Sequence, residues 1–95
     1  FANFKQVSAQ EAINLIKKGT LVIDIRDKEQ FKKGHIKGAI NIPFEKLQNN
    51  LNLIEKYKNK ELLICSKTGT NGIKISRILS KNNFKPINIK SGILG

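Results

Sequence analysis

The sequence is poor in the residues that would crosslink a small protein or carry it through a membrane. Its 95 residues include one cysteine, no tryptophan and no methionine. A single cysteine cannot form a disulfide within the chain, which excludes a secreted disulfide scaffold and fits a reducing compartment. No run of about 18 apolar residues occurs, so nothing in residues 1–95 is expected to span a membrane. The length predicts one domain over residues 1–95.

The two ends of the chain suggest a piece of a longer protein. The chain begins with Phe1 rather than a methionine, so we expect a processed or trimmed N-terminus. We expect a cytoplasmic protein that is held at a membrane only if a preceding segment, absent from this sequence, anchors it. The chain stops at Gly95, straight after an expected turn, so a final helix of such a domain is expected to be missing.

Acidic residues are also scarce. Seven Asp and Glu face 18 Lys and Arg, and the formal net charge is +11. Such a balance favours anionic partners. The lysines are scattered, however, and aromatic residues do not alternate with them as single-stranded nucleic-acid binding requires. We therefore expect small anions rather than nucleic acid as ligands.

Apolar segments alternate between strand and helix patterns along the chain. A capping box at Ser8 to Glu11 predicts a helix that ends at Gly19. Short apolar runs, β-branched at 21–25, predict buried strands. Strands are expected at 21–25, 39–42, 61–65 and 86–89, and further helices at 28–33, 44–57 and 72–82. This alternation predicts an α/β fold, with a parallel sheet and helices on both faces.

The most informative segment follows the third of these strands. Cys65 ends the strand and opens a loop, Ser66-Lys67-Thr68-Gly69-Thr70-Asn71-Gly72, that leads into a helix. Ligands of open α/β sheets bind at the carboxyl ends of the strands, and a helix N-terminus favours an anion. Such a site lowers the pKa of a thiol that faces it. A cysteine at the end of an apolar strand is also often a small buried residue. The pattern leaves both roles open for Cys65.

Several motifs together resemble the rhodanese-like domain. They are Asp24-Ile25-Arg26, Phe31, the block Gly34-His35-Ile36-Lys37-Gly38-Ala39-Ile40-Asn41-Ile42-Pro43, Lys67-Thr68-Gly69, Asn83-Phe84 and Ser91-Gly92-Ile93. The resemblance covers essentially the whole chain and implies a parallel sheet of about five strands. It also implies a sulfurtransferase, in which a loop cysteine takes sulfane sulfur from a donor such as thiosulfate. The cysteine carries this sulfur as a persulfide and then hands the outer sulfur atom to a thiol or to cyanide, which regenerates the cysteine. We expect no cofactor, no metal ion and a monomer.

The resemblance also suggests supporting roles. It implies that Asp24 and Arg26 organise the end of their strand through hydrogen bonds and an ion pair. His35, the only histidine, is expected to be a structural residue near this strand end rather than a catalytic base.

The loop departs from the family pattern, in which the nucleophile is followed by two residues and a glycine. Gly69 stands four positions after Cys65. If the loop is one residue longer, Cys65 is the nucleophile. In an ungapped alignment Ser66 occupies that place, and the domain binds an anion or a partner without transferring sulfur. Because neighbouring strand residues point to opposite faces, only one of the two can face the loop. Related phosphatases carry an arginine where Asn71 stands, which argues against phosphatase activity.

Overall fold

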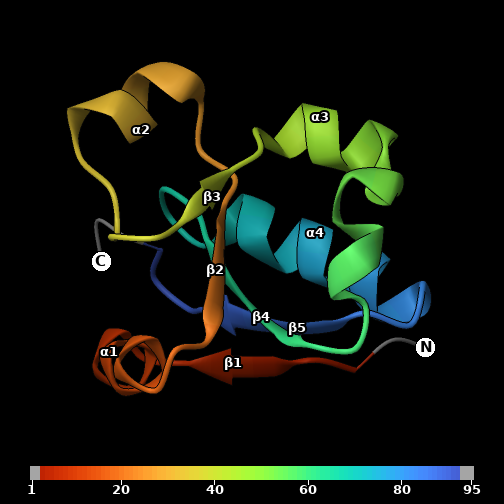
Figure 1. Cartoon of the computed structure of the whole chain (residues 1–95), viewed down its shortest axis with the longest axis horizontal. Helices are drawn as coiled ribbons and strands as arrows, with labels where there is room; N and C mark the ends of the chain where they lie inside the picture. The colour runs from red at the N-terminus through yellow and green to blue at the C-terminus, as the bar shows by residue number, and fades with distance from the viewer. Residues whose placement is uncertain (1–2, 93–95) are drawn as a thin grey trace.

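The computed structural model describes residues 3–92 and contains a five-stranded, wholly parallel sheet with helices on both faces (Figure 1). The strands are β1 (Lys5–Val7), β2 (Leu21–Asp24), β3 (Ile40–Asn41), β4 (Glu61–Cys65) and β5 (Lys85–Ile89). Their order across the sheet is β1-β5-β4-β2-β3. The helices are α1 (Ala9–Lys17), α2 (Lys28–Lys33), α3 (Phe44–Asn49), the 3-10 helix η1 (Leu51–Tyr57) and α4 (Thr70–Lys81). The predicted α/β fold is confirmed.

Most predicted elements are present, with differences at their ends. The capping box at α1 forms as predicted, since the Glu11 amide donates to Ser8 Oγ and the Ser8 amide donates to the Glu11 carboxylate. Helix α4 begins two residues earlier than expected, at Thr70. The segment 44–57 forms two helical pieces because Asn50 adopts an extended conformation, with φ −152° and ψ 82°. Strand β1 was not predicted.

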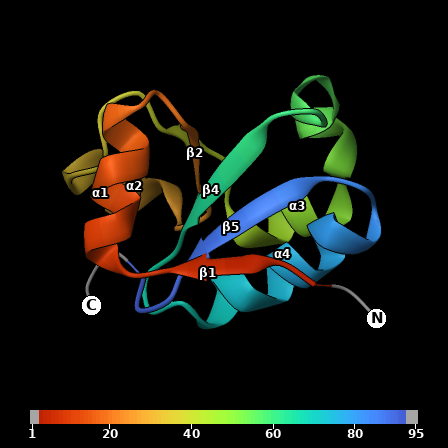
Figure 2. The same ribbon diagram turned by 90° about the horizontal axis from the view of Figure 1, so that it is seen from below.

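Two hydrophobic layers flank the sheet. Helices α3, η1 and α4 cover one face, and α1 covers the other (Figure 2). The α4 face buries Ile23, Ile25, Ile42, Leu47, Ile54, Leu62, Ile64, Ile75, Leu79 and Phe84. The α1 face buries Ala12, Val22, Leu63, Cys65, Ile87 and Ile89. Residues of β4 thus alternate between the two layers, as the pleat of a strand requires.

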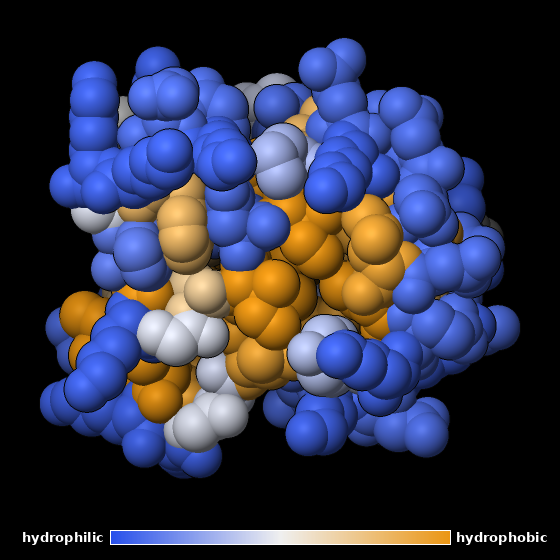
Figure 3. All heavy atoms as spheres, turned by 45° about the horizontal axis from the view of Figure 1, so that its top comes forward, coloured by the Kyte–Doolittle hydropathy of each residue, from blue (hydrophilic) through white to orange (hydrophobic). Residues whose placement is uncertain are grey.

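The surface is mainly polar. Hydrophilic side chains cover most of the face drawn in Figure 3 and surround a group of apolar side chains in its middle. Ile13 of α1 is an exposed apolar residue. Among residues 3–92, no helix combines the length and the apolar character that a membrane crossing needs.

Strand register fixes the edge at which a site is expected. In the pairing of β2 with β4, Asp24 lies beside Cys65, and the Ile25 amide donates to the Cys65 carbonyl at 2.9 Å. These residues stand at the carboxyl ends of two central strands. Loops that follow such strand ends form the ligand-binding edge of an open α/β sheet.

Candidate anion-binding site at the carboxyl edge of the sheet

Cys65 and Ser66 occupy opposite sides of the sheet. Cys65 is fully buried in the layer beneath α1, where it packs with Leu63, Ile87 and Ile89. Ser66 lies on the α4 side, lines a surface pocket and is 2% exposed. The one-residue step between them therefore separates a thiol in the core from a hydroxyl at the pocket floor.

The surroundings of Cys65 disfavour its thiolate. The pKa of the thiol is raised from 9.0 to about 12. Burial is the main cause, the nearby carboxylate of Asp24 contributes to the rise, and the guanidinium of Arg26 opposes it in part. Because the thiolate is the nucleophile, the raised pKa disfavours a reaction of Cys65 at neutral pH.

The loop after β4 is held by tight backbone packing. Gly69 has φ +97° and directly precedes α4, and a side chain there would collide with the Lys90 carbonyl. Gly92 has φ +67° and lies against the Lys67 and Ser66 carbonyls in the same way. The segment 90–92 thus supports the loop from behind. Glycine is required at both positions by the positive φ and by the lack of space.

Ser66 caps this loop from inside. The Gly69 amide donates to Ser66 Oγ at 3.0 Å. Within residues 3–92, no hydrogen bond donated by the Ser66 hydroxyl is found. The first amides of α4 have no partner inside the helix and add further donors, together with the positive end of the helix dipole.

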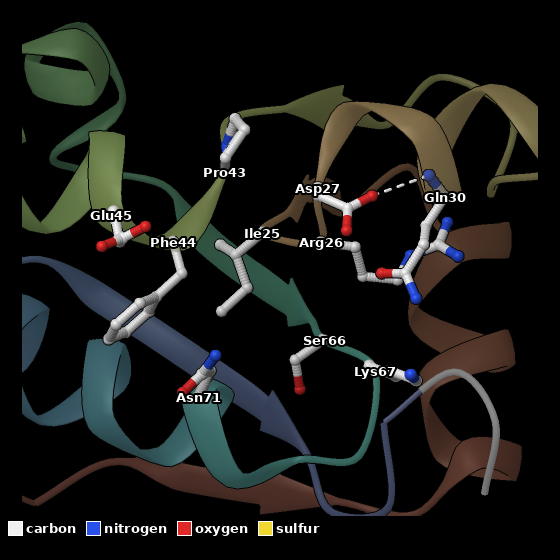
Figure 4. Close-up of a pocket in the computed structure, with 10 residues that line it drawn as sticks. All are labelled: Ile25, Arg26, Asp27, Gln30, Pro43, Phe44, Glu45, Ser66, Lys67 and Asn71. Atoms are coloured by element: carbon white, nitrogen blue, oxygen red, sulfur yellow. Dashed lines mark hydrogen bonds between the residues drawn. The ribbon is translucent and has the colours of Figure 1, made fainter.

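A pocket of about 410 Å³ opens beside the loop (Figure 4). Its walls come from the ends of β2 and β4 and from the starts of α2, α3 and α4. The lining residues are Ile25, Arg26, Asp27, Gln30, Pro43, Phe44, Glu45, Ser66, Lys67 and Asn71. A cavity of this size with a few polar groups is typical of a small-molecule site.

Asp24 and Arg26 form the ion pair that the motif predicts. The guanidinium contacts both carboxylate oxygens of Asp24 at 2.8 to 3.2 Å, and it also donates to the Gly34 carbonyl at 2.7 Å. The Asp24 side chain is fully buried, and that of Arg26 is 8% exposed. The hydrogen bond to Asp24 raises the pKa of Arg26 above its ordinary value. With its donors engaged in this way, Arg26 is a structural clamp and cannot grip an oxyanion with its full fork.

His35 lies outside the pocket. Its ring stacks on Phe31 with centroids 3.7 Å apart, and its Nδ1 lies 2.7 Å from the Phe31 carbonyl oxygen. It is linked to Asp24 only indirectly, since its neighbour Gly34 accepts a hydrogen bond from Arg26. Residues 3–92 contain no group of three or more His, Cys, Asp or Glu side chains placed to hold a metal ion.

The structure brings together part of the predicted loop. Ser66, Lys67 and Asn71 line the pocket. Thr68 and Thr70 are exposed, and Gly69 and Gly72 are buried against neighbouring segments. Ile93, the last residue of the predicted closing motif, lies outside the described residues.

Sequence reasoning missed the opposite wall of the pocket. It consists of Ile25, Asp27, Gln30, Pro43, Phe44 and Glu45. Position in the chain was the one signal available for these residues. Ile25 is the last residue of one predicted strand and Pro43 directly follows another, both at the ligand-binding edge of the sheet. Nothing in the local sequence indicated that the two segments face the loop after β4.

Comparisons with known proteins agree with this architecture. A family model described as the rhodanese-like domain matches residues 8–95. The chain is 34% identical over 94 residues to the uncharacterized protein YibN of Escherichia coli K12, covering 96% of this chain and 66% of that protein. It is 31% identical over 85 residues to the thiosulfate sulfurtransferase GlpE of Coxiella burnetii, covering 88% of this chain and 78% of GlpE. The crystal structure of a rhodanese-like domain protein from Staphylococcus aureus matches with a TM-score of 0.85 at 25% identity, covering 96% and 89% of the two chains.

Proposed function

Since this chain belongs to the rhodanese-like domain family, we propose that it binds a small anion at the loop Ser66–Gly72 without carrying sulfur. The observation that supports this proposal is the placement of the two candidate residues. The thiol of Cys65 is buried beneath α1, whereas the hydroxyl of Ser66 lies at the pocket floor. Sulfur transfer through a persulfide requires a thiolate that a donor can reach.

Ser66 cannot replace the thiol chemically. An oxygen at this position holds no persulfide, and a serine needs a neighbouring base to become a nucleophile. The only histidine, His35, is stacked on Phe31 outside the pocket and does not contact Ser66. The groups at the loop therefore favour binding over reaction.

The anion would be held mainly by neutral donors. Ser66 offers a hydroxyl hydrogen, and the first amides of α4 offer N–H groups at the positive end of a 12-residue helix. Lys67 adds a point charge at the rim of the pocket. This set of donors suits an oxyanion such as sulfate, thiosulfate or a substituted form of either.

Sulfur transfer through Cys65 is the second candidate, and the names of relatives favour it. GlpE is named a thiosulfate sulfurtransferase, and another relative from Bacillus subtilis is named a putative sulfur carrier protein. In this alternative a thiosulfate or persulfide donor and a thiol acceptor would be the partners. The end of β4 would have to turn so that Cys65 leaves the layer beneath α1 and exchanges places with Ser66.

Intact-mass measurement after incubation with thiosulfate tests the proposal. The protein is incubated without reductant beside Cys65→Ala and Ser66→Cys, and each sample is then treated with cyanide. We expect no gain of sulfur by the native protein or by Cys65→Ala. A gain of one sulfur atom by the native protein, absent in Cys65→Ala and removed by cyanide, would establish the sulfurtransferase instead.

Anion binding is measured separately by the shift of backbone amide NMR signals in a thiosulfate titration. We expect saturable shifts at Ser66 to Gly72, weakened in Lys67→Gln. Lys60→Gln, a lysine away from the pocket lining, is the matched control and should bind as the native protein does. The absence of any loop shift in the native protein would refute anion binding.

A further inference from the structure

Helix α4 carries a line of cations along its outer side. Lys74, Arg77 and Lys81 are exposed and follow one another at spacings of three and four residues. In a helix this spacing places all three on one side, over about 10 Å of its length. The buried side of α4 is directly opposite and holds Gly72, Ile75, Ser76 and Leu79. We call Lys74, Arg77 and Lys81 the cation stripe.

The cation stripe faces away from the rest of the molecule. In Figure 2 the ribbon of α4 forms the lower border of the molecule, with the sheet on its other side. Within residues 3–92, the ion pairs join Lys5 to Glu61, Arg26 to Asp24 and Lys58 to Glu55, and none of them includes the cation stripe.

The sequence around the cation stripe supplies no acidic residue. No Asp or Glu follows Glu61, whereas the same part of the chain holds Lys67, Lys74, Arg77, Lys81, Lys85 and Lys90. Like charges three and four residues apart destabilise a helix. The cation stripe is therefore repulsive within the chain, and an anionic partner would relieve this repulsion.

The composition of α4 limits the kind of partner. The helix contains no aromatic residue on which nucleic-acid bases would stack. Helices that lie on membranes insert large apolar residues beside their cations. The large exposed hydrophobic residues of the described chain, Ile13 and Leu53, lie on other elements. These observations favour an acidic protein segment over nucleic acid or a lipid surface.

Half-buried isoleucines flank the cation stripe on both sides. Ile73 and Ile78 each lie about 70° around the helix from its centre, in opposite directions. A partner helix that lays acidic side chains on the cation stripe brings its adjacent apolar residues against these isoleucines.

From these observations we infer that the outer side of α4 is a docking surface for an acidic helix of a partner protein. The partner carries Glu or Asp at spacings of three and four residues, with apolar residues beside them. This surface is separate from the pocket, because neither the cation stripe nor Ile73 and Ile78 line it. One helix of 12 residues offers a small area, so the contact is weak and salt-dependent.

A defined acidic peptide tests this surface. The probe is a fluorescently labelled helical peptide of about 18 residues, with Glu at spacings of three and four and Leu beside them. In the comparison peptide Gln replaces each Glu. We expect the native protein to bind the Glu peptide at least about tenfold more tightly than the Gln peptide, measured by fluorescence anisotropy. This affinity should fall as salt is raised from about 50 to 200 mM.

Two variants of equal charge separate the cation stripe from the overall positive field. The stripe variant carries Lys74→Gln, Arg77→Gln and Lys81→Gln. The control variant carries Lys17→Gln, Lys32→Gln and Lys60→Gln. All six residues are exposed, and each variant lowers the formal net charge of +11 by three. We expect the stripe variant to lose at least about tenfold in affinity for the Glu peptide and the control variant to stay within about threefold of the native protein.

Several outcomes would overturn the inference. Equal losses in the two variants would show that binding follows net charge alone. Equal binding of the Glu and Gln peptides to the native protein would exclude an acidic partner. Tighter binding of single-stranded DNA or of anionic phospholipid vesicles, lost in the stripe variant, would replace the protein partner by that ligand. The thiosulfate titration of the loop amides should be unchanged in the stripe variant, so the proposed function is judged separately.

Discussion

Moving the thiol by one residue should change its reactivity by orders of magnitude. The double variant Cys65→Ala, Ser66→Cys keeps a single thiol in the protein and transfers it from the core to the pocket floor. With a pKa of about 12, the native thiol is ionised to about 3 parts in 100,000 at pH 7.5. A thiol with its ordinary pKa of 9.0 is ionised to about 3% at the same pH. The thiolate populations alone therefore predict a rate ratio of about 1,000.

Alkylation by iodoacetamide, followed by intact mass, measures this ratio. The native protein should react with a half-time at least about a thousand times longer than the double variant. Both should react alike in guanidinium chloride, where neither thiol is buried. The helix N-terminus would lower the pKa of the introduced thiol and increase the ratio further. After alkylation is established, thiosulfate should load sulfur onto the double variant alone.

A native protein that alkylates within about tenfold of the double variant would refute the reasoning, because burial and the raised pKa of Cys65 both require a slow reaction. A double variant that folds but reacts as slowly as the native protein would refute the placement of Ser66 at the pocket. Circular dichroism and the urea midpoint of the variant establish that it is folded.

Three further predictions concern stability. The pKa of Cys65 is raised in the folded state, so the neutral thiol stabilises the fold fully below pH 9, and this stabilisation is lost as the pH rises toward 12. Between pH 8 and 10 the free energy of unfolding of the native protein should therefore fall by about 1.4 kcal/mol more than that of Cys65→Ala, measured by urea unfolding. Gly72→Ala should lower the free energy of unfolding by about 1–3 kcal/mol because its new methyl group collides with the buried Asn88 side chain. Gly34→Ala, which has open space around it, should lower it by less than about 1 kcal/mol, and equal losses in the two variants would contradict this packing. Asp24→Asn should lower the free energy of unfolding by about 3 kcal/mol because it leaves the arginine beside it unpaired in a largely buried place, and an unchanged urea midpoint would show that the pair contributes nothing.

The sequence predicted the central strands well because their residues are apolar on both sides. Strands β2 and β4 are buried on both faces, so their apolar runs are continuous and easily recognised. Strand β1 has the opposite character. Its three residues, KQV, are mostly exposed at the edge of the sheet, and its place is fixed by pairing with β5 rather than by its own composition. Local sequence holds no signal for such a strand.

The site was predictable in part. The loop was expected from the strand end, the glycines and the following helix, and Ser66, Lys67 and Asn71 do line a pocket. The apolar residues of the lining, Ile25, Pro43 and Phe44, were not predicted to face the loop. Ile25 and Phe44 lie about 20 to 40 residues before the loop, and they meet it only because β2 pairs with β4 and α3 packs over the same face. That proximity follows from the topology of the sheet, not from any local pattern.

The choice between Cys65 and Ser66 is made by packing on both sides of the loop. Alternation along β4 ties the direction of Cys65 to that of Leu63 beneath α1, and the pairing of Asp24 with Cys65 fixes the register. At the other end, Gly69 is confined by the Lys90 carbonyl. A longer loop that presents Cys65 to the pocket would have to break the pairing of Cys65 with Asp24. The placement of Ser66 at the pocket is therefore a consequence of how the core and the segment 90–92 hold the loop. If the proposed function is correct, we expect a change to sulfur chemistry to require a substitution at position 66 rather than a rearrangement of the fold.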